Sequence, residues 1–140
     1  MEQMTAKACR KELQKIRETI GTVTEEPGVF FRIPGGEYNN EVLRTIYACG
    51  SYPVAWSVDS MDWKEYEAGE LVRQLLQSCT IRDGEILRFH GEGENTGEMV
   101  KLLHPRLKEE GYEAVTVSQM VYKDRYRMTT EGRQIPEKSK

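Results

Sequence analysis

The sequence predicts an α/β fold in which about four parallel strands alternate with helices. Segments with helical spacing of apolar residues alternate four times with short β-prone runs. Glycines stand at the junctions, where helices end and the chain turns. Unusual polar residues follow the β-prone runs, and the carboxyl ends of parallel strands meet at one edge of a sheet. The alternation therefore favours right-handed β-α-β crossovers with polar groups gathered at one rim.

The first half of the chain contains two helical and two strand patterns. Apolar residues three and four positions apart define the helices, and runs of valine, isoleucine and aromatic residues define the strands. The predicted order is a helix over residues 7–20, a strand over 29–33, a helix over 37–48 and a strand over 52–58. Asn39 and Asn40 are both candidates for the N-cap of the second helix, because an Asn side chain accepts from backbone N–H groups there.

The second half repeats the pattern and then loses it. The predicted elements are a helix over residues 67–78, a strand over 85–90, a helix over 96–110 and a strand over 112–117. Thr96 is placed to cap the last of these helices, and Gly111 ends it. Beyond Met120 the chain becomes basic and polar. We therefore expect one domain over residues 1–122 and a polar, flexible tail over 123–140.

Composition narrows the class of protein. The 140 residues are 38% hydrophobic and 31% charged, as in an ordinary soluble domain with a core. The net charge of −3 gives no basic patch for nucleic acid, and no apolar run approaches a membrane span. The first residues lack the apolar core of a secretory signal, so we expect a cytoplasmic chain as encoded. Cys9, Cys49 and Cys79 lack metal-ligand spacing and are expected to be reduced thiols.

Polar residues near the strand ends are the candidate functional groups. Arg32 interrupts an apolar strand, and a buried guanidinium needs a carboxylate partner. Asp59 is the favoured partner and Asp62 the weaker one; the alternative is a solvated loop anchored by Trp63. His90 ends the third strand, where it is either structural or an acid–base group.

Two glycine-containing loops follow these strands. The Pro34–Gly36 segment alone is typical of a tight turn between a strand and a helix. Glu92 and Glu94 lie in the loop after His90, either as solvated charges or as neighbours that raise its pKa. His104, before a proline in a helix, is expected at the surface.

Three segments together resemble motifs of the polysaccharide deacetylases, the NodB-homology domain of carbohydrate esterase family four. Phe31–Gly36 is similar to the family's third motif, Val54–Trp63 to its fourth, and Gly84–His90 to its fifth. Gly111–Ser118 resembles the strand that ends the domain. The resemblance implies a deformed (β/α) barrel, here a partial one, that removes acetyl groups from N-acetylated sugars of chitin-like polymers or peptidoglycan.

The resemblance also implies roles for individual residues. His90 would be the general acid that protonates the leaving amine, and Arg32 would orient the catalytic base through carboxylates. Asp59, counted among the catalytic residues, and Trp63 match the family's structural support for that arrangement, and Trp63 would also bind substrate. The Pro34, Gly35 and Gly36 turn would bind substrate, with a backbone N–H near Gly35 stabilising the oxyanion.

Departures from the family limit this expectation. The first two motifs, which supply the catalytic base and the ligands of a divalent metal, usually zinc, are absent, and the two histidines present cannot replace them. Arg88, which the resemblance places among the substrate-binding residues, stands where the family has a leucine that lines the acetyl pocket. A metal lowers the pKa of bound water from about 15.7 to about 7, roughly 12 kcal/mol of nucleophile activation, whereas a general acid contributes only about 10²- to 10⁴-fold. We therefore expect no metal or other cofactor in this chain and no appreciable turnover by it alone.

These observations leave three functional hypotheses. The first is a deacetylase-like protein, the carboxyl-terminal part of such a domain, inactive as a lone chain. The second is a non-catalytic saccharide-binding or assembly module, and the third is a fragment completed by a partner chain. A half barrel would leave an open sheet edge and an uncovered apolar face, so we expect a homo-oligomer or a missing amino-terminal segment as its partner.

Overall fold

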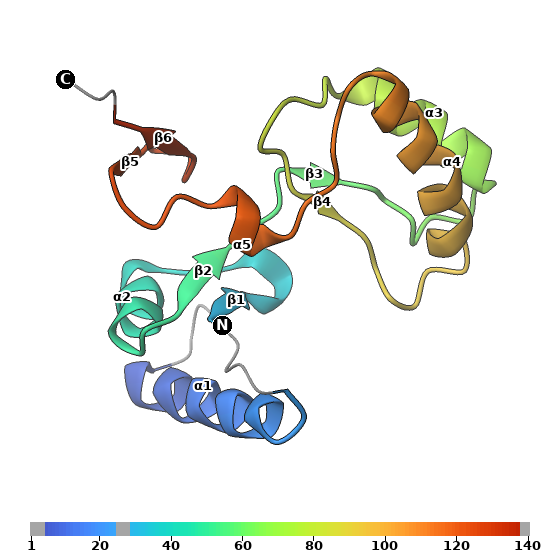
Figure 1. The fold of residues 1–140 in the computed structure, drawn as a ribbon. Coiled ribbons are helices and arrows are strands. Elements are labelled where there is room, and N and C mark those ends of the chain that lie inside the picture. Colours follow the sequence, from blue (N-terminus) through green and yellow to red (C-terminus); the bar gives the residue numbers. More distant parts are fainter. Residues whose placement is uncertain (1–4, 25–28, 138–140) are drawn as a thin grey trace. The chain divides into compact units, whose positions relative to one another are not determined.

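The computed structural model describes residues 5–24 and 29–137 (Figure 1). The chain divides into two compact units, residues 1–57 and residues 58–140. Each unit contains a pair of parallel strands and a pair of packed helices. Within the described part of the chain, no helix has the length and apolar character needed to cross a membrane.

The first unit packs two helices beside a two-stranded parallel sheet. Its elements are α1 (Ala6–Gly21), β1 (Phe30–Arg32), the short 3₁₀ helix η1 (Pro34–Gly36), α2 (Asn40–Ala48) and β2 (Tyr52–Val54). β1 and β2 are in register with Phe30 opposite Tyr52. The core contains side chains from both helices and from the residue after β1, namely Cys9, Leu13, Ile33, Val42 and Ile46. Burial of one apolar stripe from each helix explains why the helical spacing was readable in the sequence.

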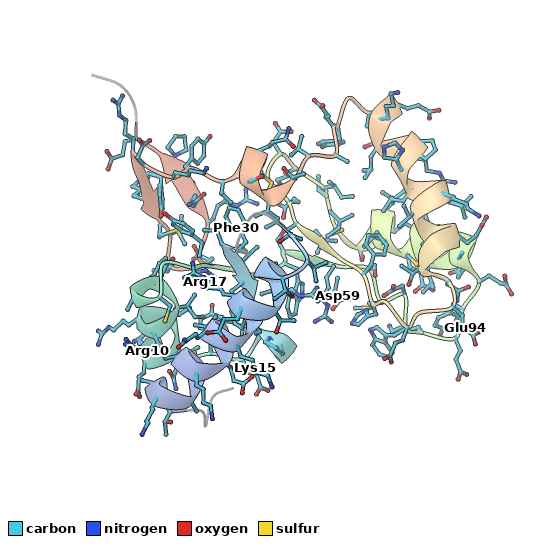
Figure 2. The ribbon with its side chains drawn as sticks, turned by 60° about the horizontal axis from the view of Figure 1, so that its bottom comes forward. Arg10, Lys15, Arg17, Phe30, Asp59 and Glu94 are labelled. Atoms are coloured by element: carbon cyan, nitrogen blue, oxygen red, sulfur yellow. The ribbon has the colours of Figure 1, made fainter. Side chains whose placement is uncertain are left out.

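Side-chain caps fix the ends of these helices. Asn39, one of the two predicted candidates, accepts a 2.9 Å hydrogen bond from the Val42 N–H. Arg17 projects from α1 (Figure 2) and donates to the carbonyl oxygens of Cys49 and Gly50 at 2.6 and 2.9 Å. These carbonyls follow the last turn of α2, so one guanidinium joins the two helices.

The second unit begins with another parallel pair. Its elements are β3 (Val58–Asp59), α3 (Ala68–Ser78), β4 (Leu87–Arg88), α4 (Thr96–Glu109), α5 (Val117–Met120), β5 (Tyr126–Met128) and β6 (Gln134–Pro136). Val58 lies opposite Leu87, and Asp59 lies opposite Arg88. Apolar residues of β3, α3 and α4 form the core, namely Val58, Ala68, Leu71, Val72, Leu75, Met99 and Leu103.

The predicted strands are only partly correct. The run over residues 52–58 separates into β2 and β3, which belong to different sheets, because residues 55–57 leave the ladder where the Trp56 ring packs on Gly36. Residues 112–116 form no strand. A capping box, in which Thr116 and Gln119 exchange hydrogen bonds, starts α5 there instead. The α/β class is confirmed, whereas a partial barrel of four parallel strands stays a prediction.

The predicted tail contains regular structure. β5 and β6 form an antiparallel hairpin with Arg127 opposite Ile135. Arg133 in the turn of this hairpin forms a 2.6 Å ion pair with Glu85, just before β4. This hairpin lies within the predicted tail, and the flexible tail over 123–140 and the domain boundary at residue 122 both stay predictions.

Candidate functional site

A tight turn after β3 places one carboxylate in the interior of the second unit. Asp59 Oδ1 accepts a 3.0 Å hydrogen bond from the Met61 N–H, and Met61 has a φ of 55°, in the left-handed region. This conformation directs the Met61 side chain toward solvent and Asp62 inward, where Asp62 is only 1% exposed. The sequence allowed a solvated loop here, and that alternative is wrong for Asp62.

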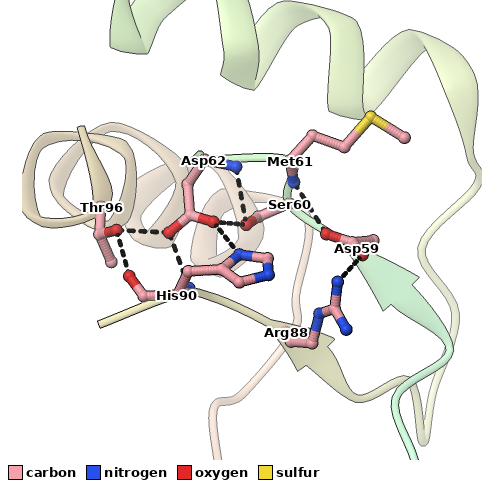
Figure 3. Close-up of polar contacts among 7 residues, drawn as sticks. All are labelled: Asp59, Ser60, Met61, Asp62, Arg88, His90 and Thr96. Atoms are coloured by element: carbon pink, nitrogen blue, oxygen red, sulfur yellow. Dashed lines mark hydrogen bonds and ion pairs between the residues drawn. The ribbon is translucent and has the colours of Figure 1, made fainter. Parts of the chain in front are cut away.

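Four hydrogen bonds satisfy the buried Asp62 carboxylate (Figure 3). Oδ1 accepts from Ser60 Oγ at 2.9 Å and lies 2.6 Å from Nδ1 of His90. Oδ2 accepts from the His90 backbone N–H at 2.9 Å and from the Thr96 hydroxyl. A buried charge needs such partners, because desolvation without compensation costs several kcal/mol.

Hydrogen bonds outweigh burial in setting the pKa of the Asp62 carboxyl. Burial by itself raises the pKa of this carboxyl, but the bonds from the Thr96 and His90 side chains, the His90 backbone and Ser60 lower its pKa to about 2. Asp62 is therefore an anion at any pH near neutrality. An ionised carboxylate can only accept hydrogen bonds, so Nδ1 of His90 must carry the hydrogen between them.

This contact sets the tautomer of His90. His90 follows β4, and its backbone N–H and ring are both held by the same carboxylate. With Nδ1 protonated, the neutral ring has its lone pair on Nε2, which points away from Asp62 in Figure 3. The side chain is 32% exposed. His90 is thus an oriented acid–base group whose second nitrogen can exchange a proton.

Thr96 and Gly93 complete this site. Thr96 was predicted to cap α4, but Asn95 holds the N-cap position without a side-chain cap. The Thr96 hydroxyl contacts Asp62 instead and lies 2.8 Å from the His90 carbonyl oxygen. A Cβ at Gly93 would lie 2.5 Å from Thr96 Oγ1 and 3.0 Å from Asp62 Oδ2, so only glycine fits without displacement.

The Asp59 carboxylate pairs with Arg88, its cross-strand neighbour, through Oδ2 and Nη2. The sequence favoured Asp59 as the partner of Arg32. In the structure Arg32 ends β1 as an exposed residue, so it does not need the buried partner that the apolar strand suggested. Arg88, predicted to bind substrate, is 20% exposed and lies two residues before His90.

The Pro34–Gly36 turn is confirmed as the 3₁₀ helix after β1. The Gly36 N–H donates to the Ile33 carbonyl at 3.0 Å, and Gly35 and Gly36 have positive φ values of 73° and 76°. A Cβ at Gly36 would lie 2.7 Å from the Trp56 ring. The geometry explains the glycines by backbone conformation and packing, and the predicted roles of this turn and of Arg32 in binding and catalysis stay predictions.

Exposed aromatic side chains lie in the loop that follows Asp62. Trp63 is 59% exposed and Tyr66 is 52% exposed. The ammonium of Lys64 lies 5.8 Å from the Trp63 ring centroid, and Asn95 donates to the Tyr66 carbonyl at 2.8 Å, which ties this loop to the start of α4. Trp63 is therefore available to a ligand, as its predicted role in substrate binding requires.

The described residues do not gather into a group that fits a metal ion. In the described ranges, no three side chains of His, Cys, Asp or Glu gather in a way that could hold a metal ion. Both oxygens of Asp62 are already hydrogen bonded. The three cysteines are free thiols, and burial raises the pKa of Cys9.

Asp62 is the residue of this site that sequence reasoning underrated. The available signal was its position three residues after Asp59, in the loop that follows a predicted strand. The register of β3 against β4 brings Asp62 to His90, and the sequence alone does not give this register.

Sequence comparison identifies relatives of known activity. The chain is 31% identical over 121 residues to the peptidoglycan-N-acetylglucosamine deacetylase PgdA of Listeria monocytogenes, covering 84% of this chain and 25% of that protein. It is 32% identical over 102 residues to the peptidoglycan-N-acetylglucosamine deacetylase of Bacillus cereus, covering 69% of this chain and 46% of that enzyme. The chain therefore spans less than half of these relatives. No protein-family profile matches it.

Solved structures agree with these relatives. A CE4 family pseudoenzyme from Bacillus anthracis superposes with a TM-score of 0.78 at 26% identity, covering 86% of this chain and 42% of that one. A mutant of that pseudoenzyme has restored enzymatic activity. A deacetylase determined with its substrate gives a TM-score of 0.72 at 29% identity, covering 84% of this chain and 57% of that one.

Proposed function

This chain is a homologue of the NodB-like polysaccharide deacetylases of carbohydrate esterase family four, and from that premise we propose that it carries the proton-donating side of an N-deacetylase site for N-acetylated saccharides. The observation that supports the proposal is the contact between Asp62 and His90, 2.6 Å between Oδ1 and Nδ1. An oriented histidine with one nitrogen held and the other available is the form that a general acid requires.

The proposed step uses both partners. The imidazolium of His90 donates the proton on Nε2 to the nitrogen of the sugar as its bond to the acetyl carbon breaks, which releases a neutral amine. Asp62 remains ionised throughout, holds Nδ1–H and stabilises the imidazolium before the transfer. His90 returns to its neutral tautomer and recovers a proton from water.

We propose further that the chain alone does not hydrolyse its ligand appreciably. A general acid contributes about 10²- to 10⁴-fold, which leaves most of the barrier to amide cleavage in place. The described residues offer no gathered group to activate water through a metal. We propose that a second copy of the chain, or a further segment of a deacetylase domain, supplies the remaining catalytic groups.

A second candidate is a saccharide-binding module without hydrolysis. The exposed side chains of Trp63 and Tyr66, in the loop beside the pair of Asp62 and His90, favour it, because aromatic faces are suited to the apolar faces of sugar rings. The fold similarity to a CE4 family pseudoenzyme is compatible with the same candidate.

The test measures binding and turnover separately. Purified chain is titrated with N-acetylglucosamine oligomers in a calorimeter, and released amine is measured with and without added zinc, for wild type, His90→Gln and Trp63→Ala. His104→Gln is the matched control, since His104 is an exposed histidine of α4. We expect binding without turnover, weakened by Trp63→Ala.

Each other outcome has a definite meaning. Turnover that zinc stimulates and His90→Gln abolishes would overturn the inactivity of the lone chain and support His90 as the acid. Turnover unaffected by His90→Gln, or no binding of any oligomer, would contradict the proposed role of this site. Sedimentation velocity on the same sample measures the proposed self-association, and a single monomeric species would exclude it.

A further inference from the structure

We propose that Thr96 is a positioning residue for His90, because its hydroxyl fixes the Asp62 carboxylate that selects the histidine tautomer. The inference deepens the proposed function, since it concerns the same acid. Its test measures the state of the His90 ring without turnover, so a failure of the proposed deacetylase role leaves it measurable.

The argument starts from how each carboxylate oxygen is held. Oδ1 contacts the His90 ring and Ser60, two residues away in the same turn. Oδ2 is held by the His90 backbone and by Thr96, which belongs to a different element, the first residue of α4. Thr96 therefore joins the carboxylate to a helix that packs in the core through Met99 and Leu103.

The hydroxyl has one proton and two neighbouring acceptors, Asp62 Oδ2 and the His90 carbonyl oxygen. A charged carboxylate is the stronger acceptor, so the proton belongs mainly to Asp62. Without the Thr96 hydroxyl, Oδ2 of Asp62 would accept a hydrogen bond only from the His90 backbone N–H. A buried anion that loses a donor is destabilised, and its side chain gains freedom to rotate away from Nδ1.

Gly93 provides the space that this arrangement needs. A Cβ there would approach Thr96 Oγ1 to 2.5 Å and the Asp62 backbone oxygen to 3.1 Å. The glycine has no positive φ to explain it, whereas neighbouring Gly91 and Gly97 have no atom within 4 Å of the corresponding position. The close approach of Thr96 and Asp62 thus explains why position 93 requires glycine. It does not explain the glycine at position 91.

The experiment is a ¹⁵N NMR measurement of the His90 ring in the intact chain, assigned by loss of its signals in His90→Gln. Thr96→Val removes the hydroxyl at nearly constant shape, Thr96→Ser keeps it, and Gly93→Ala displaces it. Gly91→Ala controls for an added methyl in the same loop. Thr45→Val controls for loss of a threonine hydroxyl elsewhere, since Thr45 is buried and bonds the Glu41 carbonyl at 2.8 Å.

We expect wild type, Thr96→Ser and both controls to have Nδ1 protonated in the neutral ring. Thr96→Val and Gly93→Ala should raise the fraction protonated on Nε2 roughly tenfold, in line with the loss of one hydrogen bond to a charged group. An unchanged tautomer in a folded Thr96→Val chain would overturn the proposal, as would a change that Thr96→Ser fails to reverse. If Thr96→Val does not fold, Gly93→Ala decides the question by the same two criteria.

Discussion

Two turns follow parallel strands in this chain, residues 33–37 after β1 and residues 60–63 after β3. The first follows the exposed Arg32 and exposes Pro34, and its shape comes from Gly36 packing under Trp56. The second buries Asp62 and surrounds it with four hydrogen bonds. Both turns have a polar residue beside an apolar strand, yet only the second fixes the ionisation and orientation of its polar groups. The comparison shows that a candidate site residue is identified better by its hydrogen-bond partners in the structure than by its position in the sequence pattern.

The largest expected effect tests this difference directly. Asp62→Ala leaves the Ser60 hydroxyl and the two His90 donors without their acceptor and should lower the free energy of unfolding by about 3 kcal/mol or more. Arg32→Ala removes an exposed side chain and should change it by less than about 0.5 kcal/mol. Hydrogen exchange of amides in α3 and α4 measures the first effect, and amides in α1 and α2 the second. Equal effects would erase the contrast between the two turns.

Gly36→Ala tests what shapes the first turn. Gly35 and Gly36 both have positive φ, so alanine at either position costs about 1 kcal/mol in backbone strain. Only Gly36 would also bring a Cβ to 2.7 Å from Trp56, whereas Gly35 has nothing within 4 Å. We expect about 2 to 3 kcal/mol for Gly36→Ala and about 1 kcal/mol for Gly35→Ala, measured by urea unfolding. Similar values for both variants would show that the Trp56 contact adds nothing.

Acid should weaken the second unit selectively. The pKa of Asp62 is lowered from its ordinary value of 3.8 to about 2, so its contribution is complete above about pH 4 and is lost as pH falls toward 2. The loss should be on the order of 2 kcal/mol. Asp62→Asn should remove this part of the acid sensitivity, which amide exchange in α3 and α4 measured from pH 4.5 to 2.5 would detect. An unchanged pH slope in Asp62→Asn would contradict the low pKa.

The sequence predicted the helices and the position of His90 well for a physical reason. Helical spacing records burial within one segment, and α1, α2, α3 and α4 each bury such a stripe. A histidine at the end of an apolar run is equally a local feature. The resemblance to the deacetylases also used local motifs, and the relatives confirm it.

The partners of the site could not be predicted in the same way. The contact between Asp62 and His90 depends on the left-handed conformation of Met61 and on the register of β3 against β4. Neither is a property of one segment. Arg32 was misjudged because β1 is short and leaves its last residue exposed, so an arginine there needs no buried partner.

The smallest expected effect concerns the ion pair beside Asp62 and His90. Asp59 and Arg88 form an ion pair with side chains 27% and 20% exposed, so water screens part of their attraction. A double-mutant cycle with Asp59→Asn and Arg88→Gln should give a coupling of about 0.5 to 1 kcal/mol, reduced in 1 M salt. Because Asp59 Oδ1 also accepts from Met61, Asp59→Asn should cost more than Arg88→Gln. A coupling above about 2 kcal/mol that salt leaves unchanged would place this pair with Asp62 and His90 as part of one rigid site, and the second turn would then owe its order to two carboxylates instead of one.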